Sequence, residues 1–197
     1  THAAQRRVLT VVMAINLAMF ILEFGGGLAA RSSALMADSA DMLGDAVVYA
    51  LSLYALSRGP RWQAGAALAK GLMILTLAFA VVVEIVRKFF SGVEPSSLLM
   101  LGFGVMALIA NLICLRLLWQ FRRANVNMSS TFECSRNDVA SNLGVLVAAG
   151  LVNWLGSGWP DMVVGGLIAM ILFRSAWRVL TSAWPVWRLQ GSGASVA

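Results

Sequence analysis

Apolar residues run along this chain in six long segments, separated by short stretches that contain charged residues, glycine or proline. A helix needs roughly 20 apolar residues to cross the hydrocarbon core of a membrane, and each segment reaches that length. The pattern therefore predicts an all-α, polytopic membrane protein. We expect its six transmembrane helices at residues 8–28, 33–56, 63–90, 98–121, 131–151 and 161–183.

Local signals suggest where these helices begin and end. The glycine run at 25–27 is expected to end the first helix, and Ser33 is a predicted N-cap of the second. The S-x-x-E pattern of Ser130 and Glu133 is typical of a capping box and predicts the start of the fifth. Residues 188–197 are rich in glycine and serine, so we predict a transmembrane domain over 1–187 and a short disordered tail.

Composition excludes the main alternative classes. The 197 residues are 59% hydrophobic and only 12% charged, with a mean hydropathy of +0.80. A soluble domain carries about a quarter charged residues, so a soluble domain, a disordered chain and a disulfide scaffold are all excluded. Six spans also leave no room for a sizeable soluble domain.

The net charge of +6 points to membrane orientation, because the basic residues gather at the ends of the apolar segments. We therefore expect no nucleic-acid partner, only membrane lipids around the spans. Three basic residues fall at one side of the predicted membrane, namely Arg31, Arg87 and Lys88. The side of both termini carries eight, namely Arg6, Arg7, Arg58, Arg61, Arg122, Arg123, Arg178 and Arg188. This bias predicts a multi-pass protein of the cell membrane, in a prokaryote the inner membrane, with both termini in the cytoplasm.

Three acids lie inside the second predicted span. At 100° per residue, Asp38 and Asp45 share one face of a helix, and Asp41 lies about 60° away. A charged group at the centre of a bilayer costs several kcal/mol, so this stripe must face other helices or water.

The fifth span carries a second polar stripe, because Cys134 and Asp138 are four residues apart and Ser141 and Asn142 continue the same face. With a rise of about 1.5 Å per residue, Asp45 lies roughly 18 Å from one membrane surface and Asp138 roughly 12 Å from the other. In a core about 30 Å thick, these depths agree to within a helical turn. Two antiparallel helices can therefore bring Asp41, Asp45, Cys134 and Asp138 together.

Carboxylates and one thiolate form a ligand set that a divalent cation such as tetrahedral Zn²⁺ accepts. A cation would also balance the clustered negative charge, and protons would do so in its absence. Metal entry would then release protons, so exchange of metal for protons is the expected mechanism.

Each of these residues also has a structural interpretation. Asp38 can serve as a hydrogen-bonding partner near the start of its helix, and Cys134 can be a small apolar filler. Cys114 has no acid on its face, which favours a core role. Glu23 is a weaker pathway candidate, since helix–helix hydrogen bonding is the alternative role of intramembrane polar residues. Lys70 is expected to snorkel or to pair with another span.

At these residues the sequence resembles the cation diffusion facilitator family of divalent-metal/proton antiporters. Residues 33–45 read SALMADSADMLGD and resemble the second-span motif of that family. Residues 134–145 read CSRNDVASNLGV and resemble its fifth-span motif, H-x-x-x-D. Two departures matter. Cys134 stands where the family usually has His, and residues after the sixth predicted span are few. We therefore expect a member that lacks the family's C-terminal cytoplasmic domain.

The resemblance implies a four-helix bundle of spans 1, 2, 4 and 5, with spans 3 and 6 packed as a pair. It also implies a homodimer and a transport site of Asp41, Asp45, Cys134 and Asp138, with Asp38, Asn142 and Glu23 as weaker candidates. The transported ion is expected to be Zn²⁺ and no cofactor is expected. The thiol makes Cd²⁺, Co²⁺, Ni²⁺ or Fe²⁺ alternatives, and Mn²⁺ a poorer one.

The function predicted from the sequence is proton-coupled efflux of a divalent metal from the cytoplasm by alternating access. Two other classes stay open at this point. One is an intramembrane metal-dependent hydrolase, although no nucleophile–base pair is evident and the only histidine, His2, lies outside the predicted spans. The other is a membrane metal sensor that binds metal without transporting it. An enzyme is not expected.

Overall fold

In the computed structural model, the described residues are 2–54, 60–124 and 126–192, and they contain α-helices and turns with no strand. Six helices follow one another along this part of the chain. They are α1 (His2–Ala30), α2 (Ser33–Tyr54), α3 (Pro60–Ser91), α4 (Ser97–Trp119), α5 (Val126–Leu155) and α6 (Trp159–Ser192). The all-α fold class predicted from the sequence is confirmed.

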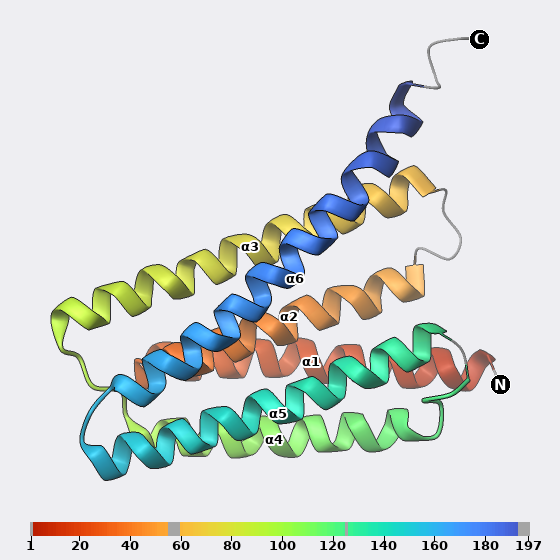
Figure 1. Cartoon of the computed structure of the whole chain (residues 1–197). Helices are drawn as coiled ribbons and strands as arrows, with labels where there is room; N and C mark the ends of the chain where they lie inside the picture. The colour runs from red at the N-terminus through yellow and green to blue at the C-terminus, as the bar shows by residue number, and fades with distance from the viewer. Residues whose placement is uncertain (1, 55–59, 125, 193–197) are drawn as a thin grey trace.

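The helices alternate in direction, so that the start of α1 and the end of α6 lie at the same end of the molecule (Figure 1). Helices α1, α2, α4 and α5 form a bundle, and α3 packs most extensively against α6. Helix α2 contacts all five other helices. The expected bundle and helix pair are therefore both present, with α2 at the centre.

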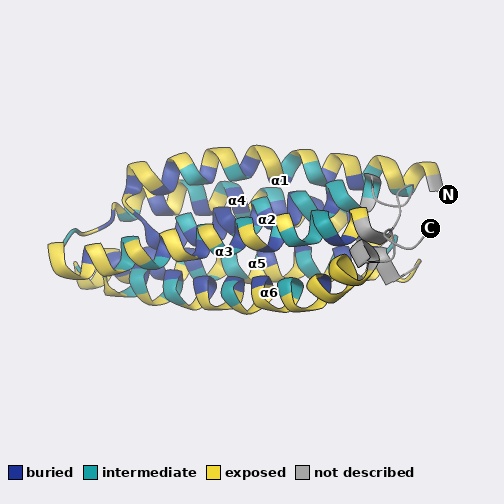
Figure 2. Ribbon diagram, turned by 90° about the horizontal axis from the view of Figure 1, so that it is seen from above, coloured by how far each residue is buried: buried dark blue, intermediate teal, exposed yellow. Residues whose placement is uncertain are grey.

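Within the part of the chain that the structure describes, five helices are long and apolar enough to cross a membrane by length and composition, namely α1, α3, α4, α5 and α6. Helix α2 carries three aspartates and is also the helix that contacts all the others. The outward faces of the assembly are exposed along its length, whereas buried residues face inward (Figure 2). Large apolar side chains such as Ile21, Phe79 and Trp154 are exposed there, as a lipid-facing surface requires.

The apolar core has two main parts along the bundle. One surrounds Leu35, Ile74 and Leu172, where α2, α3 and α6 meet. The other lies toward the end of the termini and includes Tyr49 and Cys114. The core role predicted for Cys114 agrees with its full burial in this cluster.

The predicted end of the first helix was wrong. Helix α1 continues through the glycine run to Ala30. A Cβ atom on Gly26 would lie 2.5 Å from the ring of Phe103 in α4, so this glycine allows two helices to approach closely instead of ending one.

The predicted start of the fifth helix was also wrong, because α5 begins at Val126. Glu133 is not a capping residue but forms an exposed ion pair with Arg136 at 2.5 Å. Helix α6 likewise extends to Ser192, with Pro185 inside it, so the first five residues of the predicted tail (188–192) are helical. Residues 193–197, Arg58 and the predicted last two residues of the second span, 55 and 56, lie outside the described residues.

Candidate metal centre

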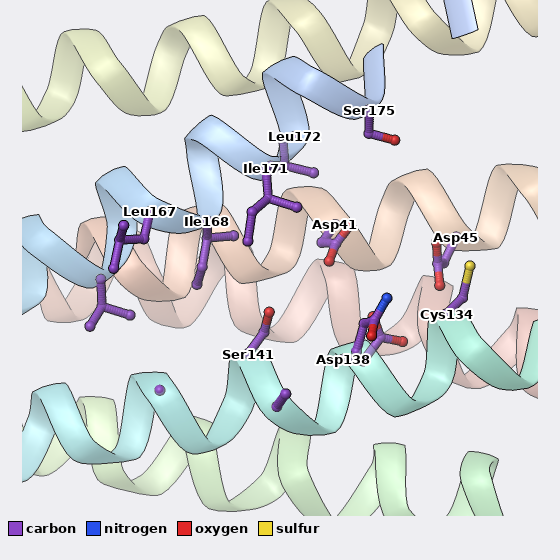
Figure 3. A pocket seen from close by; sticks show the side chains of 14 residues that line it. Asp41, Asp45, Cys134, Asp138, Ser141, Leu167, Ile168, Ile171, Leu172 and Ser175 are labelled. Atoms are coloured by element: carbon purple, nitrogen blue, oxygen red, sulfur yellow. The ribbon is translucent and has the colours of Figure 1, made fainter. Parts of the chain in front are cut away.

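Two acids of α2 and one acid of α5 line a single cavity, whose wall also includes exposed side chains such as Leu167 and Ile171. The cavity has a volume of about 570 Å³ and lies between α2, α5 and α6. Asp41 and Asp45 reach it from α2, whereas Cys134 and Asp138 reach it from α5 (Figure 3). The four residues that the sequence singled out as a transport site therefore face one space.

The i, i+4 spacing explains this arrangement, because residues four apart lie one above the other on a helix face. Figure 3 shows the two side chains of each helix pointing toward the facing helix. Helix α6 supplies the remaining wall, which is mainly apolar and includes Leu167, Ile168 and Ser175. The cavity thus combines a polar wall on two helices with an apolar wall on the third.

The cavity acids are poorly satisfied by the protein itself. Asp45 is 8% exposed and accepts a hydrogen bond from the hydroxyl of Tyr49 at 3.1 Å. Asp138 is 2% exposed, and its Oδ2 atom has no hydrogen-bond partner. A buried carboxylate without a partner is costly, so these groups favour a bound cation or a proton.

The side chains do not form a preassembled coordination shell. Among the described residues, no three His, Cys, Asp or Glu side chains are close enough together to hold one metal ion. The four residues are brought to one cavity, and joint coordination by Asp41, Asp45, Cys134 and Asp138 stays a prediction.

A lysine from a third helix contributes to the electrostatics of the cavity. Lys70 in α3 is half-buried, and its charge interacts with Asp45, Cys134 and Asp41. Its charge therefore acts on groups of α2 and α5, whereas direct pairing with another span stays a prediction. One positive charge offsets part of the negative charge of three acids, and the remainder needs a further cation.

The weaker candidates lie elsewhere, inside the four-helix bundle. The Nδ2 atom of Asn142 donates to Oδ2 of Asp38 at 2.6 Å, and Asn111 donates to Oδ1 of Asn142 at 3.3 Å. Glu23 is fully buried, and neither of its carboxylate oxygens has a hydrogen-bond partner. None of Asp38, Asn142 and Glu23 lines the cavity between α2, α5 and α6.

The sequence interpretation missed a second acid-centred cluster at the start of α2. The two carboxylate oxygens of Asp161 accept hydrogen bonds from the Ser32 hydroxyl at 2.6 Å and from the backbone N–H groups of Ser33 and Ala34 at 2.8 and 3.0 Å. The Nζ atom of Lys88 donates to Oγ of Ser33 at 2.8 Å and lies 3.5 Å from Oδ2 of Asp161.

The local turn places this cluster. Arg31 adopts a left-handed conformation (φ 53°), and the N–H of Ser32 donates to the carbonyl of Gly27 at 2.8 Å. Ser32 then accepts from the N–H of Leu35 at 3.1 Å, so Ser32 is the N-cap and the predicted cap Ser33 is the first helical residue. Lys88 lies near the end of the third predicted span and Asp161 begins the sixth. This shared position at one membrane surface was the only feature of the sequence that suggested a contact between them.

Comparison with known proteins adds independent information. A family model described as the cation efflux transmembrane domain matches residues 9–186. The chain is 26% identical over 189 residues to the metal cation efflux system protein CzcD of Cupriavidus metallidurans, covering 90% of this chain. It is 28% identical over 187 residues to the zinc transporter ZitB of Yersinia pestis, covering 87% of this chain.

A third relative is the cadmium, cobalt and zinc/H(+)-K(+) antiporter of Bacillus subtilis, 22% identical over 192 residues and 90% of this chain. The matches cover 60%, 59% and 62% of the CzcD, ZitB and Bacillus proteins, respectively. The chain therefore spans about three fifths of the length of these relatives.

Proposed function

We propose that this chain, which belongs to the cation efflux transmembrane-domain family, carries a divalent transition-metal ion across the membrane as its substrate, outward from the cytoplasm and in exchange for protons. One observation carries the proposal. Three carboxyl groups and a thiol from two helices line a single cavity between α2, α5 and α6 of a membrane protein. Such a cluster is costly in a membrane unless a cation uses it.

The donor set narrows the choice of metal. Carboxylate oxygens and one sulfur favour borderline ions, with Zn²⁺ first and Cd²⁺, Co²⁺, Ni²⁺ and Fe²⁺ as alternatives. The names of the relatives, zinc transporter and cadmium, cobalt and zinc antiporter, support the same group of ions. Since the side chains stand apart without metal, coordination by all four requires them to draw together as the ion enters.

Exchange for protons follows from charge balance in the cavity. Asp41, Asp45 and Asp138 place up to three negative charges there, and Lys70 offsets one. Protons supply the remaining compensation when the cavity is empty, and an entering divalent ion displaces them. The ion leaves when protons return to the carboxylates. Repetition of this exchange from alternate sides of the membrane gives net transport.

Within this proposal the protein spans the cell membrane with both termini in the cytoplasm and functions as a homodimer. The surplus of basic residues at the side of the termini supports the orientation. Crosslinking in native membranes tests the dimer, and tagging each terminus followed by protease protection tests the orientation.

Transport is tested in proteoliposomes that carry a pH gradient. We expect uptake of Zn²⁺ that requires the gradient, and measurable uptake of Cd²⁺, Co²⁺ or Ni²⁺ but little of Mn²⁺. Asp138→Ala should abolish the flux. Cys134→Ser should lower the preference for Cd²⁺ over Mn²⁺ about tenfold, since a thiolate favours softer ions.

Glu133→Gln provides the matched control, because Glu133 lies on the same helix but is exposed and does not line the cavity. Its flux should equal that of the unchanged protein. Metal binding without flux would favour the membrane sensor instead. Neither binding nor flux would mean that the cavity acids serve the structure alone.

A further inference from the structure

We infer that Asp161 and Lys88 are positioning residues that latch the cavity shut at the end of α2 where residues 31–33 lie. The latch consists of Ser32, Ser33, Lys88 and Asp161. This inference rests on the proposed transport function, because a latch matters when the cavity must open to alternate sides. It concerns residues outside the candidate metal centre.

Every contact of the latch joins different helices or their connecting turns. Asp161 begins α6, and its carboxylate binds the N–H groups of Ser33 and Ala34 at the start of α2. Lys88 comes from the last turn of α3. The latch therefore ties α2, a central helix of the bundle, to both members of the α3–α6 pair.

Part of the N-terminal capping of α2 comes from Asp161 of α6. This capping therefore exists only while α6 is in contact with the start of α2. The first N–H groups of a helix have no partner within it, and a carboxylate near them is favoured by the helix dipole. For α2, Ser32 supplies one partner and Asp161 supplies two more. If α6 moves away from α2, the N–H groups of Ser33 and Ala34 and the hydroxyl of Ser32 lose their carboxylate acceptor together.

The latch lies directly beside the cavity. Val164 lines the cavity and stands one helical turn after Asp161 in α6. At the next residue of α6 its backbone touches α2, because a Cβ atom on Gly165 would lie 2.8 Å from the carbonyl carbon of Ser33. The contact of α6 with α2 at this end therefore bounds the cavity.

The opposite end of the cavity is built differently. There α3 and α6 diverge from α2 and α5 toward the end of the molecule that carries both termini (Figure 1). The cavity extends in that direction to Cys134 on α5 and Ser175 on α6. The arrangement corresponds to a cavity that is latched at one end and approached from the other.

Polar contacts suit a closure that must reopen. A buried ion pair adds little net stability compared with apolar packing, because removing both charges from water is costly. Asp161 and Lys88 both stand at helix ends, where water at the membrane surface can solvate them once they separate. Opening α6 away from α2 would then exchange protein hydrogen bonds for water, and the cavity would face the other side of the membrane.

The test uses the native thiol of Cys134 as a reporter of cavity access. The background is Cys114→Ser, which leaves Cys134 as the single cysteine. Labelling by a membrane-impermeant thiol reagent is measured separately from each side of sealed, oriented vesicles. With the latch intact, labelling should come mainly from the side of the termini.

Two variants weaken the latch to different extents. Asp161→Asn removes the charge with little change in shape, and Lys88→Met removes the ammonium but leaves the three hydrogen bonds of Asp161. We expect labelling from the side of residues 31–33 to rise about tenfold in Asp161→Asn and less in Lys88→Met, relative to labelling from the other side. Lys88→Arg keeps the charge and should restore the ratio.

Arg87→Met is the matched control. Arg87 is the neighbouring basic residue, and its side chain is 79% exposed and paired only at the surface with Glu84 at 3.6 Å. Its labelling ratio should equal that of the background protein. Each variant is first shown to be folded by its elution as a single species in detergent.

An unchanged labelling ratio in folded Asp161→Asn and Lys88→Met would overturn the latch, as would equal labelling from both sides in the background protein. The readout does not depend on metal flux. If the protein transports no metal but the ratio shifts as expected, the proposed function fails and the latch stands. If transport occurs and the ratio never shifts, the reverse holds.

Discussion

Asp161 and Asp138 are two buried acids of this molecule with opposite surroundings. Asp161 is fully buried, and its oxygens accept three hydrogen bonds and face the ammonium of Lys88. Asp138 is 2% exposed and faces a cavity with one oxygen that has no partner. The protein supplies hydrogen-bond donors for the Asp161 carboxylate, which thereby links helices. The Asp138 carboxyl group instead favours a bound cation or a proton.

The number of hydrogen-bond donors around each carboxylate distinguishes a structural acid from a ligand-binding acid, whereas the extent of burial does not. Both residues are almost fully buried in the membrane domain, although Asp161 stands at the start of a predicted span and Asp138 well inside one. The number of donors aimed at each carboxylate decides its role. Asp38, which accepts a hydrogen bond from the amide of Asn142, differs from the cavity acids in a second way, because it does not line the cavity.

The largest effect is expected from removal of the satisfied acid. Asp161→Ala leaves the buried Lys88 ammonium without a counterion and removes two hydrogen-bond acceptors from the start of α2, so the free energy of unfolding should fall by about 3–5 kcal/mol. Asp138→Asn should leave metal-free stability unchanged or higher, because one oxygen of the Asp138 carboxyl group has no hydrogen-bond partner to lose. Denaturant unfolding in detergent measures both, and equal losses in the two variants would invalidate the comparison.

Metal should stabilise the folded protein through the cavity acids. At a Zn²⁺ concentration of about 100 Kd, the gain in unfolding free energy is about 2.7 kcal/mol for one site. Asp138→Asn should lose most of this gain, whereas Glu133→Gln should keep it. Thermal unfolding with and without Zn²⁺ gives the difference, and full protection in Asp138→Asn would place the site elsewhere.

An added methyl group at the contact between α6 and α2 should have an intermediate effect on the free energy of unfolding. A Cβ atom on Gly165 would lie 2.8 Å from the Ser33 carbonyl carbon, so Gly165→Ala should push α6 from α2 and cost about 1–3 kcal/mol. The neighbouring Gly166→Ala is the control, since its nearest contact would be Ile85 at 3.9 Å. Similar stability of the two variants, measured by denaturant unfolding, would argue against tight closure at this end.

The smallest loss of stability is expected from substitution of an acid that is exposed and does not line the cavity. Glu133 forms an exposed ion pair with Arg136, and such pairs contribute about 0–1 kcal/mol. Glu133→Gln should therefore lower the free energy of unfolding by less than Asp161→Ala or Gly165→Ala does. A large loss would mean that helical acids in this protein matter for stability wherever they lie.

Much of this architecture is readable from the order of residues. Apolar segments of spanning length predict six helices, and the i, i+4 spacing in Asp41–Asp45 and Cys134–Asp138 places each pair on one helix face. Short connections make neighbouring helices antiparallel, so the two pairs face each other at similar depth. The six helices and the two pairs of residues on one helix face depend on local sequence, and the structure contains both.

Helix ends were less predictable, because glycine, serine and glutamate act according to what surrounds them. Gly26 accommodates the Phe103 ring instead of ending a helix, and Glu133 pairs with Arg136 instead of capping one. Asp38 and Asp45 share a helix face, yet only Asp45 lines the cavity. Two helical turns separate them, and different neighbours lie at the two heights.

The sequence by itself determined the helices, their order and the two faces that carry acids, because these depend on hydrophobicity and helical period alone. Only the tertiary structure decided which acids are satisfied. Asp161 meets Ser32 across 129 residues of chain, and Lys88 meets Ser33 across 55. No local pattern encodes such a meeting, since hydrogen bonds between distant helices exist only once the helices have packed.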